Sequence, residues 1–241
     1  MRRLVAPALL LLLPLHGCGD DEQTLTVLAA ASLADVFEEL AVAFEEEHDV
    51  EVRFSFGSST DLAEQAANGA PGDVLATADV VSMRVAEDAG VTGDVAAFAT
   101  NELVLVTPPD DPAGIASLDD LAGATWVRCA DEVPCGRVAV AVLADHGVTA
   151  APASLEEDVR ATLDKVTAGE ADAALVYATD AVAAGDAVRT VPIPGAASER
   201  TTCSVSTLEQ AGAADLAEEW VGLLRSDEGR QLLTDAGFGP P

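Results

Sequence analysis

Small polar residues stand at two places where a strand-like segment gives way to a helical pattern. Ser32 follows the apolar run Leu25–Ala31, and Ser58 and Ser59 follow the alternating segment Val50–Phe56. A helix N-terminus presents free backbone N–H groups and the positive end of the helix dipole, so it binds anions without a cationic side chain. A serine there either caps the helix or adds a donor for the anion. Both interpretations stay open for each serine, and together they suggest an oxyanion-binding cleft.

Other classes of chemistry lack the residues that they need. The segment Gly57–Ser59 does not match the Gly-x-Ser-x-Gly nucleophile elbow, and the chain has neither a Walker loop nor a Gly-x-Gly-x-x-Gly motif. The three histidines, His16, His48 and His146, are scattered, which disfavours a zinc site. We therefore expect no enzyme, no catalytic residues and no cofactor. An exported hydrolase that uses Ser59 remains an outside alternative.

The composition is that of an acidic globular protein. The 241 residues include 12 Lys and Arg against 42 Asp and Glu, for a formal net charge of −30 at pH 7, and 49% of residues are hydrophobic. This charge repels phosphate backbones, so we expect no nucleic-acid partner. The apolar content is sufficient for a core, and the length suits one large domain or two lobes. Salt screens the field over about 8–10 Å, so local N–H and O–H dipoles decide anion binding inside a cleft.

Strand and helix patterns alternate along the chain. Apolar residues recur at helical spacing after Ser32, and Asp35 stands in the capping-box position of that helix. Further strands are predicted over 50–56, 73–77, 103–107, 125–129 and 173–177, and further helices over 136–146, 155–168, 213–225 and 228–236. Such alternation predicts mainly parallel sheets covered by helices, with ligands at the carboxyl ends of the strands. The break at Pro108–Pro112 is the predicted crossing between two lobes.

The N-terminus has the pattern of an exported lipoprotein. Arg2 and Arg3 precede the apolar run Leu4–Leu15, which is too short to span a membrane and suits a secretory signal. The segment Leu15–Cys18 resembles a bacterial lipobox, with His16 as an uncommon occupant. It predicts cleavage before Cys18, a lipid on the sulfur, and anchoring to the outer face of the cytoplasmic membrane. An ordinary signal peptide cleaved elsewhere is the alternative.

The remaining cysteines agree with export. Cys129 and Cys135 flank a short loop, and an oxidising compartment permits a disulfide between them. Cys203 then has no partner, and we expect it to be a buried free thiol.

Several short segments, in the same order, resemble the molybdate-binding proteins of bacterial ABC importers. Each motif alone is weak, but together they extend over almost the whole chain after the signal segment. The segments are 29–33, 56–62 with Gln65, 69–71, 73–74, 101–106, 133–136, 157–160, 176–181 and 236–238.

The resemblance implies an α/β periplasmic-binding-protein-like fold of type II. Two lobes, each with a mainly parallel sheet flanked by helices, would close on a ligand in the cleft between them. We divide the chain into a signal peptide (1–17), a tether (18–24), a first lobe (25–106 with 202–241) and a second lobe (107–201).

The resemblance also assigns ligand residues. Carried onto the matching positions, Ser32 and Ser59 would donate through hydroxyl and backbone N–H, Cys135 and Val159 through backbone N–H, and Tyr177 through its phenol, with Ser58 as an accessory. The family commonly has Ala at the position of Cys135. Because the donor there is the main chain, the difference need not impair binding, and a disulfide to Cys129 would hold that N–H in place.

The function implied is that of a lipid-anchored monomer that captures molybdate and delivers it to the membrane permease of an ABC importer. Tungstate should bind as well because it is nearly the same size, and either metal would be held only as its oxyanion through the ligand residues. A pocket of donors suits a dianion and leaves the O–H of a protonated phosphate without an acceptor. The alternative is a receptor for another tetrahedral oxyanion such as sulfate.

Overall fold

The computed structural model describes residues 23–241. The predicted signal peptide, the lipidation site Cys18 and most of the tether lie outside the described residues, so these remain predictions. Within residues 23–241, no helix has the length and apolar character needed to cross a membrane.

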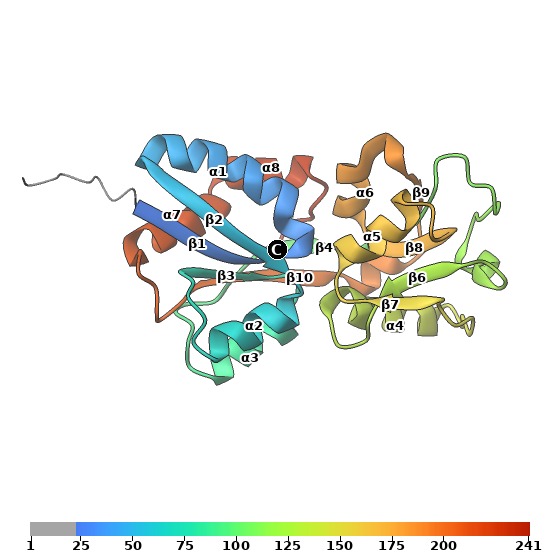
Figure 1. Cartoon of the computed structure of the whole chain (residues 1–241), viewed down its shortest axis with the longest axis horizontal. Coiled ribbons are helices and arrows are strands. Elements are labelled where there is room, and N and C mark those ends of the chain that lie inside the picture. Colours follow the sequence, from blue (N-terminus) through green and yellow to red (C-terminus); the bar gives the residue numbers. More distant parts are fainter. Residues whose placement is uncertain (1–22) are drawn as a thin grey trace, which may run out of the picture.

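Two five-stranded sheets form two lobes that lie side by side (Figure 1). The first sheet has the order β2 (Val50–Gly57), β1 (Gln23–Ala30), β3 (Val74–Thr77), β10 (Thr201–Thr207) and β4 (Ala96–Asn101). The second has the order β7 (Ser154–Glu156), β6 (Trp126–Cys129), β8 (Ala173–Tyr177), β5 (Leu103–Thr107) and β9 (Arg189–Val191). The predicted two-lobed α/β architecture is therefore confirmed.

One strand in each sheet runs against the others. In the first sheet β1 pairs in parallel with β2 and β3, whereas β10 is antiparallel to β3 and β4. In the second, β6 pairs in parallel with β7 and β8, whereas β5 is antiparallel to β8 and β9. The reversed strands β5 and β10 are the ones that enter their sheet from the other lobe. Both therefore start at the cleft, whereas β1, β2, β6 and β8 end there.

The position of the first crossing differs from the prediction. β5 pairs with β8 in the second sheet, with Leu103 opposite Tyr177, so the chain leaves the first lobe at Asn101–Leu103 and not at Pro108–Pro112. Residues 103–106 consequently belong to the second lobe. A fully buried apolar strand such as β5 has the same local pattern in either sheet, so only its pairing reveals its lobe. The return crossing leads into β10 at Thr201, next to the predicted boundary.

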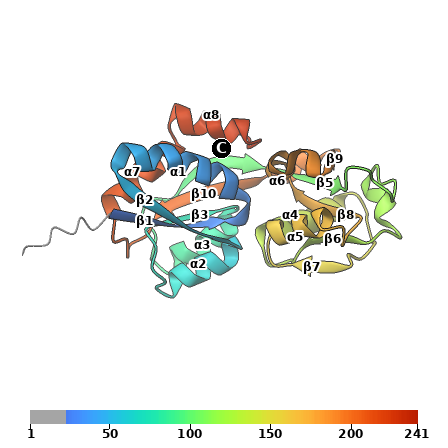
Figure 2. The same cartoon turned by 45° about the horizontal axis from the view of Figure 1, so that its top comes forward.

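Helices cover both faces of each sheet. In the first lobe α1 and α8 lie over one face, and α2 and α3 lie under the other (Figures 1 and 2). In the second lobe α5 and α6 lie on one side and α4 on the other (Figure 1). The helices are α1 (Ala34–His48), α2 (Ser59–Ala67), α3 (Val80–Asp88), α4 (Pro134–Asp145), α5 (Val159–Thr167), α6 (Ala178–Ala184), α7 (Ala214–Leu224) and α8 (Asp227–Asp235).

The helix α1 illustrates how the sequence builds these layers. Val36, Phe37, Leu40, Ala41 and Phe44 recur at helical spacing and are all buried against the sheet. The rings of Phe37 and Phe44 pack edge-on against Trp220 of α7, with centroid distances of 5.5 and 5.2 Å. This contact fixes α1, and with it the preceding turn, on the first sheet.

Two helix starts differ from the predictions. A 3-10 turn, Ala31–Leu33, precedes α1, and no side chain caps either element, so the predicted capping box at Ser32 is absent. The predicted helix over 155–168 is divided into strand β7 and helix α5. The Asp158 carboxylate begins α5 by accepting a hydrogen bond of 2.9 Å from the backbone N–H of Ala161.

Candidate anion-binding site

A small cavity lies between the lobes at the carboxyl ends of β1, β2, β6 and β8. Its volume is about 20 Å³. A water-sized group needs about 10–15 Å³ of such space, so the cavity has room for at least one group of that size. All five predicted ligand residues and the accessory Ser58 line it; the full lining is Ala30, Ala31, Ser32, Gly57, Ser58, Ser59, Ala78, Val133, Pro134, Cys135, Asp158, Val159 and Tyr177.

Helix starts bring the predicted donors together from both lobes. From the first lobe, Ser32 lies in the 3-10 turn before α1, and Ser59 is the first residue of α2. From the second, Cys135 and Val159 lie in the first turns of α4 and α5, and Tyr177 directly precedes α6. The first N–H groups of a helix have no partner within that helix. The positive ends of these helices therefore lie around the one cavity.

Three hydroxyls on the cavity wall are buried without a hydrogen-bond partner among residues 23–241. They are Ser32 Oγ, Ser58 Oγ and the Tyr177 phenol, whose residues are 5%, 6% and 1% exposed. A buried hydroxyl left unpaired costs about 1–3 kcal/mol. Neither serine caps a helix through its side chain, which removes the simplest structural explanation. Three such groups therefore surround one cavity, each with a proton that no residue of the described chain accepts.

The hydroxyl of Ser59 has a different environment. Its Oγ accepts a hydrogen bond of 2.9 Å from the backbone N–H of Ala78. A hydroxyl has one proton and two lone pairs, so this bond leaves the proton of Ser59 available for a ligand. Neither His48 nor His146 lines the cavity, and His48 instead pairs with Glu219 at 3.1 Å. Ser59 thus has no histidine beside it to act as a base.

The electrostatics of the cavity favour hydrogen-bond donation. Burial away from water raises the pKa of the Tyr177 phenol well above its usual range, and the nearby charges of Asp79 and Asp180 add to this. The phenol therefore keeps its proton and remains a donor. Asp158 is the one charged residue in the cavity lining, and one of its carboxylate oxygens is occupied in capping α5. Within residues 23–241, no group of three or more His, Cys, Asp or Glu side chains is arranged to hold a metal ion.

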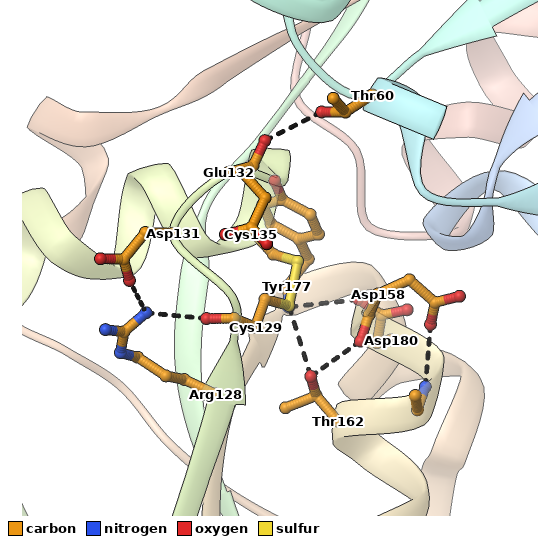
Figure 3. Close-up of a disulfide and its surroundings, with 11 residues drawn as sticks. Thr60, Arg128, Cys129, Asp131, Glu132, Cys135, Asp158, Thr162, Tyr177 and Asp180 are labelled. Carbon is orange, nitrogen blue, oxygen red and sulfur yellow. Dashed lines mark hydrogen bonds and ion pairs between the residues drawn. A yellow bond between two sulfur atoms is a disulfide. The ribbon is translucent and has the colours of Figure 1, made fainter. Parts of the chain in front are cut away.

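The predicted disulfide Cys129–Cys135 is present (Figure 3), with the two Cα atoms 5.7 Å apart. It joins the end of β6 to the first turn of α4. Cys129 Sγ lies 3.3 Å from the Thr162 hydroxyl of α5, which donates a 2.8 Å hydrogen bond to the Asp158 carbonyl. The bridge thus connects the two helix starts that carry the Cys135 and Val159 N–H groups. Cys203 is free and buried, as predicted.

A buried carboxylate supports the Tyr177 side of the cavity. Asp180, in the first turn of α6, accepts a hydrogen bond of 3.2 Å from the Tyr177 backbone N–H. Arg160 forms an ion pair of 3.2 Å with it. Burial raises the pKa of the Asp180 carboxyl to about 7, although Arg160 lowers it.

Replacing this carboxyl should change how stability depends on pH. The pKa of an Asp in the unfolded chain is about 4. As pH rises from there to about 7, the unfolded chain loses this proton while the folded chain keeps it, so the free energy of unfolding falls. We expect Asp180→Asn to weaken this decline, which urea unfolding across that pH range will measure. Equal slopes in the variant and the wild type would contradict a raised pKa at Asp180.

Sequence reasoning missed the charged residues around the donors. Arg137 and Arg160 each form an ion pair with an aspartate of the opposite lobe, Asp79 and Asp35 respectively. The chain has 12 Lys and Arg. Two of these, Arg137 and Arg160, come two residues and one residue after a predicted N–H donor. This position in the sequence could have identified them as residues near the site.

Comparison with known proteins gives concordant results. Residues 25–239 match the model of a family described as bacterial extracellular solute-binding protein. The chain is 34% identical over 223 residues to the molybdate-binding protein ModA of Mycobacterium tuberculosis (strain H37Rv), covering 91% of this chain and 85% of that protein.

Solved structures share the architecture at lower identity. The periplasmic molybdate-binding protein of Azotobacter vinelandii superposes with a TM-score of 0.80 at 21% identity, covering 90% of this chain and 99% of that one. The sulfate-binding protein SubI of Mycobacterium tuberculosis H37Rv gives 0.79 at 17% identity, covering 91% and 87%. At these identities the two structures establish the fold alone.

Proposed function

The chain belongs to the family of bacterial extracellular solute-binding proteins, and on this basis we propose that it captures molybdate and delivers it to an ABC importer. Its relative ModA, at 34% identity and 91% coverage of this chain, is a molybdate-binding protein. The role of a solute-binding protein is to bind and release, so no bond is made or broken. Molybdate is the ligand, and the protein needs no cofactor.

The three unpaired hydroxyls of Ser32, Ser58 and Tyr177 carry this proposal. They line a cavity whose wall also includes residues from the first turns of α2, α4 and α5, and its lining has no cationic side chain. Such a site offers several directed protons to a small, fully ionised oxyanion and little to an organic solute. The same geometry suits sulfate, since both anions are tetrahedral dianions. The ModA relative favours molybdate over sulfate.

Titration calorimetry with molybdate, tungstate, sulfate and phosphate tests the assignment. We expect the tightest binding for molybdate and tungstate, weaker binding for sulfate, and the weakest for phosphate. Tighter binding of sulfate than of molybdate would instead make the protein a sulfate receptor. Heat from none of the four anions would overturn the proposal as a whole.

Ser59→Ala provides a test at a single donor. The change removes a hydroxyl that is free to donate and also leaves the Ala78 N–H without its acceptor. We expect the affinity for molybdate to fall about tenfold or more, as for loss of a hydrogen bond to a charged group. Ser198→Ala is the matched control, because that hydroxyl bonds its own turn at the Gly195 carbonyl. A Ser59→Ala variant with wild-type affinity would remove Ser59 from the site.

The same variant addresses the outside alternative of an exported hydrolase. A hydrolase would turn over an ester substrate, and Ser59→Ala would abolish that turnover. We expect no turnover in the wild type either, since neither His48 nor His146 lines the cavity.

The remaining features of the proposal concern where the protein works. We propose that Cys18 is lipidated and anchors a monomer to the outer face of the cytoplasmic membrane, beside the permease of the importer. The lipobox-like segment Leu15–Cys18 supports the anchor. Mass spectrometry of the membrane fraction would detect the lipid on Cys18, and Cys18→Ser would release the protein from the membrane.

A further inference from the structure

Arg137 of α4 reaches from the second lobe into a polar cluster of the first. Its guanidinium bonds the Asp79 carboxylate through Nε at 2.8 Å and through a terminal nitrogen at 2.7 Å. The same terminal nitrogen donates to Ser82 Oγ at 2.9 Å. Beside it, the Thr60 hydroxyl of the first lobe donates a 2.9 Å hydrogen bond to the Glu132 carbonyl of the second (Figure 3). The side chains of Arg137 and Asp79 are only 28% and 10% exposed.

Arg160 of α5 makes a second connection between the lobes. Its guanidinium forms an ion pair with Asp180 in its own lobe and another with Asp35 of α1 in the first lobe. Asp180 is fully buried, so it holds the arginine in position for Asp35. The Asp35 side chain is 58% exposed, and this pair is therefore the more solvated of the two.

The two connections lie on opposite faces of the molecule, with the anion cavity between them. Asp35 belongs to α1 and Asp79 caps α3, and these helices cover opposite faces of the first sheet (Figure 1). Each arginine also follows a cavity donor closely. Arg137 comes two residues after Cys135, and Arg160 comes directly after Val159. The residues that form the ion pairs are therefore neighbours in the chain of the residues that enclose the anion.

We propose that Arg137–Asp79 and Arg160–Asp35 are two clasps that hold the lobes closed and determine how long the anion stays bound. This rests on the proposed function, and it assigns the four side chains as positioning residues that do not touch the anion. The cavity lining contains no cationic side chain that could attract the anion and so draw the lobes together. The attraction between the lobes comes instead from the two ion pairs outside the cavity. Because each arginine is paired with an aspartate, the closing attraction adds no net positive charge that would draw in other anions.

The physical effect follows from where the pairs form. In an open cleft the partners lie in different lobes and are separated, so the pairs stabilise the closed form selectively. A ligand must dissociate through the open form, so weaker clasps speed dissociation. The association rate depends on the encounter with the open form, so loss of a clasp does not lower it. Loss of a clasp therefore shows in the dissociation rate constant.

Charge-removing variants of each clasp test the proposal. Asp79→Asn keeps a side-chain oxygen to cap α3 at the Ser82 N–H while removing the charge that pairs with Arg137. We expect the dissociation rate constant of molybdate to rise on the order of tenfold, because several charge-assisted bonds are weakened. Asp35→Asn should raise it a few-fold, since that partner is more exposed. Radiolabelled molybdate chased with unlabelled molybdate gives these rates.

A double-mutant cycle and a control separate clasping from general destabilisation. Arg137→Gln combined with Asp79→Asn should dissociate no faster than the faster of the two single variants, because both remove one interaction. Arg189→Gln is the matched control: Arg189 pairs with Asp111 at 2.5 Å within the second lobe. Its dissociation rate constant should equal that of the wild type. Unchanged rates in both clasp variants, or an equal rise in Arg189→Gln, would overturn the proposal.

A ligand-free measurement keeps this result distinct from that of the proposed function. If the wild type fails to bind molybdate in calorimetry, the proposed function fails, whereas the clasps can still be assessed by small-angle scattering. We expect the double variant Asp35→Asn/Asp79→Asn to have a larger radius of gyration than both the ligand-free wild type and Arg189→Gln. Equal radii for all three proteins would reject the clasps even if molybdate binds.

Discussion

Tyr177→Phe is expected to lower the affinity for molybdate by about 10- to 100-fold, which corresponds to loss of one hydrogen bond to a charged acceptor. The same change removes a buried phenol that has no partner within residues 23–241. The ligand-free protein should therefore be as stable as the wild type or more stable, by up to about 1 kcal/mol. A lower affinity in calorimetry, together with an equal or higher free energy of unfolding in urea, would show that the Tyr177 phenol serves ligand binding and not the stability of the fold.

Ser206→Ala is a suitable comparison for this variant. Ser206 is fully buried in β10, and its hydroxyl donates a 2.9 Å hydrogen bond to the Thr207 carbonyl. Removing a satisfied hydroxyl away from the cavity should lower stability by about 1 kcal/mol and leave anion affinity unchanged. If Tyr177→Phe behaved like Ser206→Ala, with reduced stability and full affinity, the phenol would have a packing role instead.

Gly136→Ala is expected to damage both stability and binding. A Cβ at this position would lie 1.6 Å from the Ala130 carbonyl oxygen, which no side-chain rotation can relieve because the contact is with backbone. The loop from Ala130 to Pro134 must therefore move, and with it the disulfide and the Cys135 N–H. We expect the free energy of unfolding to fall by about 2–4 kcal/mol and the affinity for molybdate to fall at least about tenfold.

Gly222→Ala is the control for the glycine substitution. Gly222 lies within α7, and a Cβ there meets nothing within 4 Å. Alanine is the better helix former, so this variant should be as stable as the wild type or more stable by up to about 1 kcal/mol. Urea unfolding and calorimetry on both variants measure the difference. A Gly136→Ala protein that matches Gly222→Ala in both experiments would show that the loop has room for the extra carbon.

Local patterns in the sequence predicted the elements well but not their assembly. The apolar run 103–107 is β5 with the predicted bounds, because β-branched and leucine side chains suit a buried strand. Its assignment to a lobe was wrong, since pairing partners are distant in sequence. Elements with mixed patterns, such as α3 and β10, were not predicted at all. Their burial comes from packing against other strands and helices, which no local window contains.

At the cavity, the sequence indicated the residues better than their local roles. Ser32 precedes an amphipathic helix with Asp35 in the capping-box position, which predicts a cap, yet the chain forms a 3-10 turn there and leaves the hydroxyl unpaired. Asp35 instead pairs with Arg160 across the cleft. The capping-box rule considers only partners close in sequence, whereas Asp35 pairs with a residue that is distant in sequence and close in the fold. The clasps join residues 58 and 125 positions apart, beyond the reach of any spacing argument.

The direction of β1 has a consequence for how the molecule would stand on a membrane. β1 ends at the cavity with Ala30, and its eight residues place Gln23 about 23 Å away, at the outer end of the first lobe (Figure 2). Cys18 precedes Gln23 by five residues. A lipid on Cys18 would attach the first lobe to the membrane by the end that faces away from the cleft. The first lobe would then stay in place at the membrane, and the second lobe, which carries Arg137 and Arg160, would move as the cleft opens and closes.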